Sequence, residues 1–266
     1  MAGPIITLLT DFGWSDNYVG VMKGVILSLC PEARLVDLTH GIPPQDVAAG
    51  AFLLERSVGW FPPRTVHLAV VDPGVGTKRR GLVALAGGQL FVAPDNGLLT
   101  HILAAHPQAE VFAIENSSLL PVKRSRTFHG RDVFAPIAAQ LAVGLPPVSV
   151  GARAHEPVRL TLPACRREGR ALLGCIVYVD HFGNLVSNVS GDALDALGPP
   201  DRLRVSVAGR VVTRVMPHYE AVGVGESLAV VGGFDRLEIS TRNGNAAESL
   251  GLSVGADVRV EVGISE

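Results

Sequence analysis

The sequence predicts two domains: an α/β N-terminal domain with a mainly parallel sheet flanked by helices, and a small all-β C-terminal barrel. Strand-like and helix-like segments alternate through the first half of the 266 residues, as in an α/β layer. The segment 146–168 is rich in proline, glycine and arginine. Beyond it, short strand-like runs recur about every eight to twelve residues between turns. We therefore expect an N-terminal domain at 1–155, a linker at 156–169 and a C-terminal domain at 170–266.

The N-terminal elements follow from hydrophobic periodicity. A continuous apolar run such as 66–71 is typical of a strand that is buried on both faces of a sheet. Val19, Met22, Ile26 and Leu29 recur at helical spacing, and Pro31 stops that helix. Applied along the chain, these criteria predict strands at 5–9, 34–38, 66–71, 82–85 and 90–93, helices at 19–29, 47–58 and 132–143, and a helix that runs through His101 after a turn at 95–97.

The C-terminal elements are short and separated by turns. The spacing predicts a small antiparallel barrel or a sandwich, interrupted by one helical piece at 246–250. The expected strands are 172–179, 203–207, 211–216, 227–231, 237–240 and 258–262.

Composition narrows the classes of function. Hydrophobic residues make up 47% and charged residues 18%, which indicates a compact folded chain. A net charge of −2 gives no electrostatic reason to expect a nucleic-acid partner. No apolar run reaches the roughly 18–20 residues that span a bilayer, and no basic-then-apolar leader opens the chain. Cys30, Cys165 and Cys175 lack metal-ligand spacing. We expect a cytoplasmic protein without a membrane partner.

Familiar site motifs are missing from the sequence. It contains no GxGxxG opening a helix, no GxxxxGK[ST], no GxSxG and no HExxH. The lack of the first pattern argues against a generic Rossmann oxidoreductase. We therefore expect neither a bound metal nor a cofactor.

Three residues at expected strand ends and loops are candidates for catalysis: Asp72, Arg79 and His129. Each also has an ordinary interpretation. Asp72 begins an Asp-Pro-Gly turn, Arg79 and Arg80 are possible surface charges, and His129 is a possible structural histidine. Asp11, after the first strand, suits either a ribose diol or a turn cap. None of these residues decides the function alone.

Seven motifs taken together are more specific. They are TDFG (10–13), HGIPPQD (40–46), VVDPGVGT (70–77), APDNGLLT (93–100), TFHGRDVFAP (127–136), DHFGN (180–184) and RNGNAAE (242–248). In this order they resemble the S-adenosyl-L-methionine (SAM) hydroxide adenosyltransferases, the SAM hydrolases related to bacterial fluorinase and chlorinase. The resemblance covers nearly the whole chain.

The resemblance implies an α/β domain followed by a β-barrel, assembled as a homotrimer with SAM at the subunit interface. It assigns Asp72, Arg79 and His129 to the set that positions the attacking water, with Arg80 as the alternative arginine. It implies that Asp11 holds the ribose diol, that Asp16 and Asp180 lie near the methionine ammonium, and that Phe128 packs near the reacting carbon. The remaining implied substrate residues are Gly130, Phe182, Asn184, Asn245 and Ala246. It leaves the residue that binds the methionine carboxylate undecided.

The implied reaction suits these residue types. Displacement at the ribose C5′ releases methionine as a neutral thioether, so no general acid is needed. His129 is then available to accept or relay a proton, and Arg79 favours an ionised Asp72. Attack on a sulfonium removes charge, which a dry apolar pocket favours. We expect adenosine and L-methionine as products.

Two alternatives remain at the level of sequence. A halogenase would deliver halide to the same carbon, but the halogenases of this group carry a tyrosine where this chain has Asp72, and an ionised Asp72 would repel a halide. A SAM or adenosine sensor would bind without turnover, although it would have little use for Asp72, Arg79 and His129.

Overall fold

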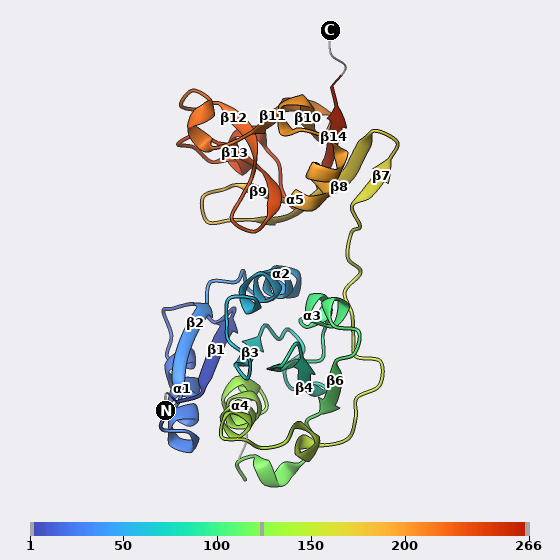
Figure 1. Ribbon diagram of the computed structural model, residues 1–266. Coiled ribbons are helices and arrows are strands. Elements are labelled where there is room, and N and C mark those ends of the chain that lie inside the picture. The colour runs from blue at the N-terminus through green and yellow to red at the C-terminus, as the bar shows by residue number, and fades with distance from the viewer. Residues whose placement is uncertain (1–2, 123–124, 264–266) are drawn as a thin grey trace. The chain divides into compact units, whose positions relative to one another are not determined.

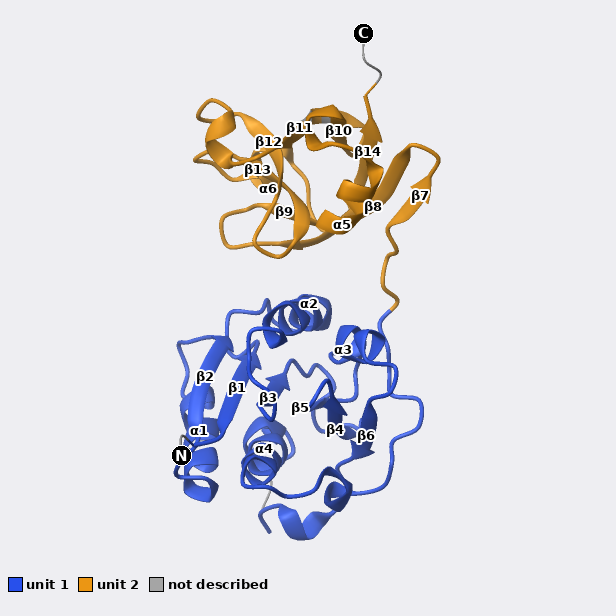
Figure 2. Cartoon of the chain, viewed as in Figure 1, with its two compact units in different colours: residues 1–160 blue, residues 161–266 orange. Residues whose placement is uncertain are grey.

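A computed structural model describes residues 3–122 and 125–263, and the chain divides into two compact units, 1–160 and 161–266 (Figures 1 and 2). The boundary between the units falls inside the range 156–169 that the sequence analysis assigned to a linker. A short strand, β7 (Arg166–Glu168), also lies in that range.

The first unit is built on one sheet. Among its described residues, six strands pair in the order β2-β1-β3-β5-β4-β6. Their bounds are β1 (Ile5–Thr10), β2 (Arg34–Thr39), β3 (Val66–Val70), β4 (Gly81–Ala86), β5 (Gln89–Pro94) and β6 (Glu110–Ala113). β1 pairs in parallel with β2 and β3, and β3 pairs in parallel with β5. β4, however, is antiparallel to both β5 and β6.

The expectation of a mainly parallel sheet is therefore wrong, because the sheet is mixed. The physical reason is the connection between β4 and β5. Only Gly87 and Gly88 lie between these strands, and both have positive φ, so the chain reverses in a tight hairpin. A parallel crossover needs about a dozen residues.

Helices cover both faces of the sheet (Figure 1). On one face, α1 (Tyr18–Leu29) and α4 (Ala135–Ala142) share a core with alternate residues of β1, such as Ile6 and Leu8. On the other face, α2 (Val47–Val58) packs so closely that a Cβ added at Gly50 would lie 2.9 Å from Leu98 Cδ1 and 3.1 Å from Val71 Cγ2. α3 (Thr100–Ala105) packs beside α2. This two-sided covering explains the continuous apolar strands.

One expected helix has a different start. The range 132–143 is divided between a π-helical turn (Gly130–Phe134) and α4. Such turns insert one residue into a helix and occur often at functional sites. Hydrophobic periodicity does not reveal the insertion, because the apolar positions on either side of it still follow a helical spacing.

The second unit is a closed barrel. Within the residues described there, seven strands pair in the order β14-β10-β11-β12-β13-β9-β8, and β8 pairs back with β14, while β7 adds to β8. Ring closure rules out the sandwich that the sequence left open. The barrel is also not fully antiparallel, since β11 and β12 run parallel. The bounds are β8 (Ala171–Val179), β9 (Leu185–Ser190), β10 (Leu203–Val207), β11 (Arg210–Met216), β12 (Ser227–Val231), β13 (Arg236–Thr241) and β14 (Asp257–Val262), with helices α5 (Gly191–Leu197) and α6 (Ala246–Leu250).

Candidate active site

The candidate catalytic residues of the first unit gather at one edge of its sheet. β1 and β3 are parallel, with Thr10 level with Val70, so Asp11 and Asp72 both follow strands that end at this edge. β4 runs the opposite way, and its first residue lies opposite the last residue of β5. Arg79, two residues before β4, therefore lies at the same edge. The antiparallel strand is what brings the arginine to the aspartate.

A compact loop joins β3 to β4 and presents Arg79. The Thr77 hydroxyl donates to the Gly74 carbonyl oxygen at 2.7 Å and accepts from the Arg79 N–H at 3.3 Å. At Gly76, φ is +80°, and an added Cβ would lie 2.6 Å from the Arg126 carbonyl oxygen. Glycine is required there both by the backbone conformation and by this close approach. The loop is thus held against the segment that leads to His129.

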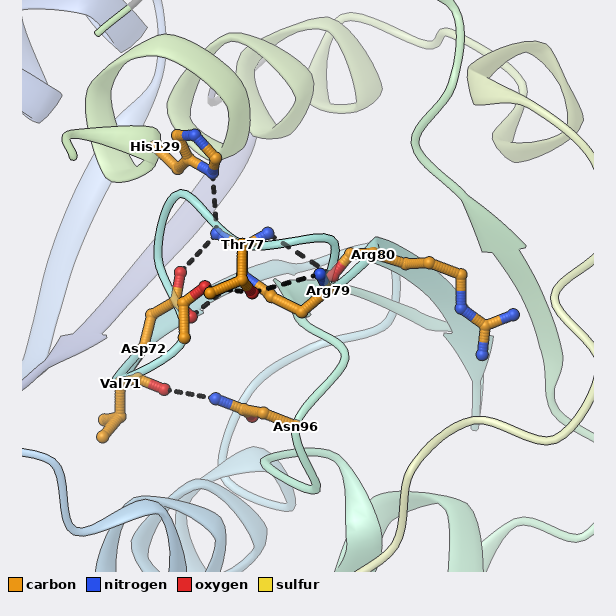
Figure 3. Close-up of polar contacts among 8 residues, drawn as sticks. Val71, Asp72, Thr77, Arg79, Arg80, Asn96 and His129 are labelled. Carbon is orange, nitrogen blue, oxygen red and sulfur yellow. Dashed lines mark hydrogen bonds and ion pairs between the residues drawn. The ribbon is translucent and has the colours of Figure 1, made fainter. Parts of the chain in front are cut away.

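Arg79 connects Asp72 and His129 (Figure 3). Its Nε donates to Asp72 Oδ1 at 2.9 Å, and its Nη2 donates to Asp72 Oδ2. Nη2 also donates to His129 Nδ1 at 2.8 Å. The side chains of Arg79 and Asp72 are 11% and 5% exposed, so this ion pair is shielded from bulk water. A two-pronged pair of this kind fixes the guanidinium plane.

The contact with Arg79 also fixes the state of His129. A guanidinium only donates hydrogen bonds, so His129 Nδ1 accepts, and a neutral ring carries its proton on Nε2. Protonation of Nδ1 would set two donors against each other beside a positive charge. The geometry therefore favours a neutral His129.

The π-helical turn holds Arg79 from a second side. His129 immediately precedes this turn, and Phe134 ends it. The Arg79 Cζ atom lies 5.1 Å from the centre of the Phe134 ring, and Phe134 is fully buried. One local element thus supplies both the histidine contact and the aromatic face.

Arg80 has different partners. Its Nε donates to Asp95 Oδ2 at 2.8 Å, and its guanidinium reaches the carbonyl oxygens of His155 and Glu156 at 3.3 Å. Figure 3 shows its guanidinium pointing away from Asp72. Of the two neighbouring arginines, Arg79 is the one in the cluster.

Asn96 supports the end of β3 and was given no role by the sequence. Its Nδ2 donates to the Val71 carbonyl oxygen at 2.8 Å, directly before Asp72 (Figure 3). The signal available was its place in the Asp-Asn-Gly turn, where an asparagine side chain often bonds to backbone.

Asp11 lies on the same edge, beside a group of aromatic rings. Its Oδ2 accepts from the Gln45 N–H at 2.8 Å. The neighbouring Phe12 ring lies 6.2 Å from that of Phe128, and Tyr18 lies 5.2 Å from Phe128. The sequence analysis singled out Phe128 alone. The available signal was the aromatic density of residues 12–18 in a chain with only 5% aromatic residues.

Two more expected residues belong to this region. Gly130 is buried, and a Cβ there would lie 3.0 Å from Met22 Sδ and 3.2 Å from the Phe12 ring, so its lack of a side chain permits this packing. Asp16 is exposed in the loop between β1 and α1.

The remaining expected residues lie in the second unit, around the loop between β8 and β9. Asp180 Oδ1 accepts from the N–H groups of Phe182 and Asn184, both at 2.9 Å, and its Oδ2 accepts from Asn184 Nδ2 at 2.8 Å. Asp180 therefore folds the loop as well as offering a carboxylate. Phe182 is 72% exposed, whereas Asn184 is buried.

The loop rests on the start of α6. The Ala247 N–H donates to the Gly183 carbonyl oxygen at 3.0 Å, and the Asn245 side chain caps the helix by accepting from the Glu248 N–H at 3.0 Å. Ala246 is fully buried. Asn245 and Ala246 thus lie next to the loop of Asp180.

A buried carboxyl group near this loop escaped the sequence analysis. Glu238, on β13, is 3% exposed and accepts hydrogen bonds from the Tyr219 hydroxyl and, at 3.4 Å, from Ser240. Burial raises the pKa of Glu238, and the nearby Asp180 raises it further. Strand alternation places Leu237 and Ile239 in the barrel core and Glu238 on the opposite face, so a sequence pattern shows neither the burial of Glu238 nor its partners.

No metal centre emerges from the side chains. Among residues 3–122 and 125–263, no three histidine, cysteine, aspartate or glutamate side chains form a group that could hold a metal ion. The expectation that the protein needs no metal or cofactor stays a prediction.

Comparison with known families assigns both units. Residues 6–151 match the profile described as the SAM hydroxide adenosyltransferase N-terminal domain, and residues 174–259 match that of the C-terminal domain. The chain belongs to the SAM hydroxide adenosyltransferase family. The resemblance inferred from the seven motifs is confirmed.

Individual members of this adenosyltransferase family are similar over nearly the full length. A protein of Salinispora tropica named (R)-S-adenosyl-L-methionine hydrolase is 41% identical over 265 residues, covering 98% of both chains. A protein of the same name from Thermus thermophilus is 38% identical, covering 96% of this chain and 98% of the other. A fluorinase of an Actinoplanes species is 31% identical over 80% of this chain and 81% of its own.

A solved structure shows the same adenosyltransferase fold. A conserved protein of Thermotoga maritima, whose structure is titled as uncharacterized, has a TM-score of 0.90 and 38% identity, covering 96% of this chain and 99% of its own. Within the part of the chain that the structure describes, no helix is long and apolar enough to cross a membrane.

Proposed function

We propose that this chain is a SAM hydrolase, in which water displaces L-methionine at the ribose C5′ and adenosine is formed. The observation that carries the proposal is the shielded cluster of Asp72, Arg79 and His129. It occurs in a chain 35% to 41% identical to several proteins named (R)-S-adenosyl-L-methionine hydrolase.

The reaction asks little of a protein beyond placing a nucleophile. Methionine leaves as a neutral thioether, so its departure needs no proton. The barrier is lowered by holding water in line with the C5′–sulfur bond, and such orientation is worth about 7–11 kcal/mol in well-aligned systems. A rigid polar cluster of this type suits that task.

The contacts suggest how the cluster divides the work. Arg79 holds the His129 ring in place through Nδ1, and in this proposal the Nε2–H of that ring would orient the water oxygen. Asp72 carries the negative charge of the cluster and attracts the hydrogens of the water. As the C–O bond forms and the C5′–sulfur bond breaks, the proton released from the water passes to solvent, because both oxygens of Asp72 already accept hydrogen bonds from Arg79 and a second positive charge on His129 would lie beside the guanidinium.

The remaining residues are proposed as substrate contacts. Asp11 would accept hydrogen bonds from the ribose hydroxyls, and Phe128 would pack beside the reacting carbon. In the second unit, Asp180 would pair with the methionine ammonium, Phe182 would stack on adenine and Asn184 would hydrogen-bond it. The remaining contacts are Asp16, Gly130, Asn245 and Ala246. We further propose a cytoplasmic homotrimer with the substrate at the subunit interface.

Halide transfer is the second candidate, because fluorinases are among the relatives. They are more distant, at 27% to 31% identity. An anion placed close to the carboxylate of Asp72 would be repelled, at a cost of several kcal/mol in a poorly solvated site, by the estimate of about 4 kcal/mol for unit charges 4 Å apart. This favours water over halide.

The test is chromatography of SAM incubated with the purified protein, with and without a large excess of chloride. The two sulfonium epimers are assayed separately, since the relatives are named for the R form. Equal amounts of adenosine and methionine, independent of chloride, support the hydrolase. A chloride-dependent halonucleoside would make the protein a halogenase. Tight binding with SAM left intact would instead identify a sensor.

A further inference from the structure

A chain of polar contacts lies behind the loop that carries Asp11. His40, which follows β2, is fully buried, and its Nδ1 lies 2.8 Å from the hydroxyl of Thr10 at the end of β1. Its Nε2 lies 3.0 Å from Asp37 Oδ1, and Lys23 Nζ donates to Asp37 Oδ2 at 2.6 Å. No role in the reaction proposed above uses these four residues.

The direction of each hydrogen bond in this row of contacts follows from the residues at its two ends, Lys23 and the Phe12 N–H. Asp37 is a carboxylate held by Lys23: partial burial raises its pKa, but the hydrogen bonds from Lys23 and His40 outweigh this, so the pKa lies below its usual value. His40 Nε2 must then donate to Asp37. A neutral His40 accepts at Nδ1, so the Thr10 hydroxyl donates to it and keeps its oxygen for the Phe12 N–H, at 3.2 Å.

The same histidine segment also holds the Asp11 loop through its backbone. The Gly13 N–H donates to the His40 carbonyl oxygen at 2.8 Å. Asp11 itself is bonded to the Gln45 N–H, five residues further along. Contacts to residues 40–45 therefore hold Thr10, Asp11 and Gly13.

A second threonine–histidine pair on β1 shows which part of this arrangement is general. The Thr7 hydroxyl lies 2.8 Å from His67 Nδ1. The side chains of this pair and of the Thr10–His40 pair are all fully buried. Thr7 and His67 are paired positions within β1 and β3, so the hydrogen bond between them joins two strands and involves no loop residue. Both pairs place a threonine hydroxyl against a histidine Nδ1, but only the Thr10 pair is connected to Asp37 and to the Asp11 loop.

We propose that His40, oriented by Asp37, is a positioning residue that fixes Thr10 and the Phe12–Gly13 backbone and so holds Asp11 ready for the substrate's ribose. The inference rests on the proposed function, in which Asp11 binds the ribose diol. His40 does not touch the substrate in this account. It acts on affinity through the shape of one loop.

The test compares Thr10→Val with Thr7→Val. Both changes preserve shape. Thr7→Val removes the hydrogen bond to His67, and Thr10→Val removes both the bond to His40 and the bond from the Phe12 N–H, so both lower the thermal unfolding temperature. We expect Thr10→Val to raise the KM for SAM about tenfold, with kcat within about twofold of the wild type, as for lost uniform binding. Thr7→Val should leave both constants near wild type. Equal KM values in the two variants would overturn the proposal.

Two further variants separate positioning from a merely structural effect. Thr10→Val is repeated in an Asp11→Asn background, where the loop's carboxylate is already lost. There it should change KM by less than about twofold, because the two changes act on one interaction. The same increase in both backgrounds would show that Thr10 does not act through Asp11. His40→Asn, which keeps a group near Nδ1, should retain more affinity than His40→Leu.

Calorimetric SAM binding is measured for every variant beside turnover. If the wild type binds SAM without hydrolysing it, the proposed function fails while the affinity difference between Thr10→Val and Thr7→Val still tests the positioning role. If the wild type hydrolyses SAM and the two variants have equal affinity, the positioning role alone fails. A wild type that neither binds nor hydrolyses SAM contradicts both.

Discussion

At the scale of single residues, two adjacent arginines have separate tasks. Arg79 donates to both Asp72 and His129, whereas Arg80 is bonded to Asp95 and to two carbonyl oxygens. The residue type is the same, and the partners around each side chain distinguish the guanidinium in the cluster from its neighbour. This difference allows a matched test at neighbouring positions.

We expect Arg79→Lys to lower kcat about a hundredfold while SAM affinity changes little, because a lysine cannot make the two-pronged bond and also reach His129. Arg80→Lys is the control and should keep kcat near wild type. Both constants are measured by single-turnover kinetics with calorimetric binding. Similar losses in the two variants would show that the cluster is not the water site.

His67 gives a pH dependence of stability. Burial lowers the pKa of His67 from 6.5 to about 4, and its Nε2 has no hydrogen-bond partner among the described residues. In the unfolded chain His67 is protonated as the pH falls below about 6.5, whereas in the folded chain it stays neutral down to about pH 4. Stability is therefore lost as the pH falls through this window, by up to about 3 kcal/mol.

The check is the free energy of unfolding from pH 7 to pH 4.5, for the wild type and for His67→Gln. The wild type should lose more stability over this range than the variant. Parallel curves for the two proteins would show that His67 does not titrate as its burial requires.

At the scale of elements, the π-helical turn Gly130–Phe134 organises the site. It brings His129 at its start and Phe134 at its end onto the same arginine. An ordinary helical turn would rotate these two residues differently, because the inserted residue shifts the phase of the helix by about 100°. The turn therefore positions Arg79 and also contributes Phe134 to the core.

We expect Phe134→Leu to lower kcat about tenfold, since Arg79 loses the aromatic face that restricts it. Phe91→Leu is the control. Phe91 is equally buried but stacks on His67, 5.0 Å between ring centres. Both variants should lose thermal stability, and only the first should lose turnover. A kcat near wild type for Phe134→Leu would show that the aromatic face of Phe134 is not needed to position Arg79 for catalysis.

In the barrel, Gly183 sets the loop of Asp180. Its φ is +81°, and a Cβ would lie 2.0 Å from the Asn245 Oδ1 atom. Gly183→Ala should therefore destabilise the protein by more than about 2 kcal/mol and weaken SAM binding.

Gly209→Ala is the matched control, because Gly209 has φ of +76° and no atom within 4 Å of the added Cβ. It should cost only about 1 kcal/mol and leave SAM binding unchanged. Unfolding in urea and SAM calorimetry provide both readouts. Equal affinity in the two variants would place the substrate away from the Asp180 loop.

At the scale of the whole molecule, the proposed substrate contacts are divided between two units. Asp11, Phe128 and the catalytic cluster belong to residues 1–160, and Asp180, Phe182 and Asn184 belong to residues 161–266. The proposed homotrimer would complete each site from two chains. Assembly is then a condition of activity rather than a separate property.

We expect light scattering to give the mass of three chains, and activity per chain to fall when the protein is diluted below the concentration at which the trimer dissociates. The control is dilution with SAM present, which should delay the fall because substrate bound across an interface stabilises it. A fully active monomer would place a complete site within one chain.

The sequence by itself determined most of the elements and the family, and it named the candidate site residues. Periodicity predicted most strands and helices, because burial on one or two faces leaves a trace in the order of apolar residues, but it missed β6, β9 and α5. The spacing of seven motifs indicated the family, which the family profiles confirm. Asp72, Arg79 and His129 were all named before any geometry was known.

Only the tertiary structure decided how these parts meet. The closure of the barrel through β8 and β14 and the contacts that distinguish Arg79 from Arg80 depend on residues far apart in the chain. The same is true of the Thr10–His40 contact, thirty positions apart. Hydrophobic periodicity reports which face of an element is buried, but it carries no information about which distant residue lies against that face.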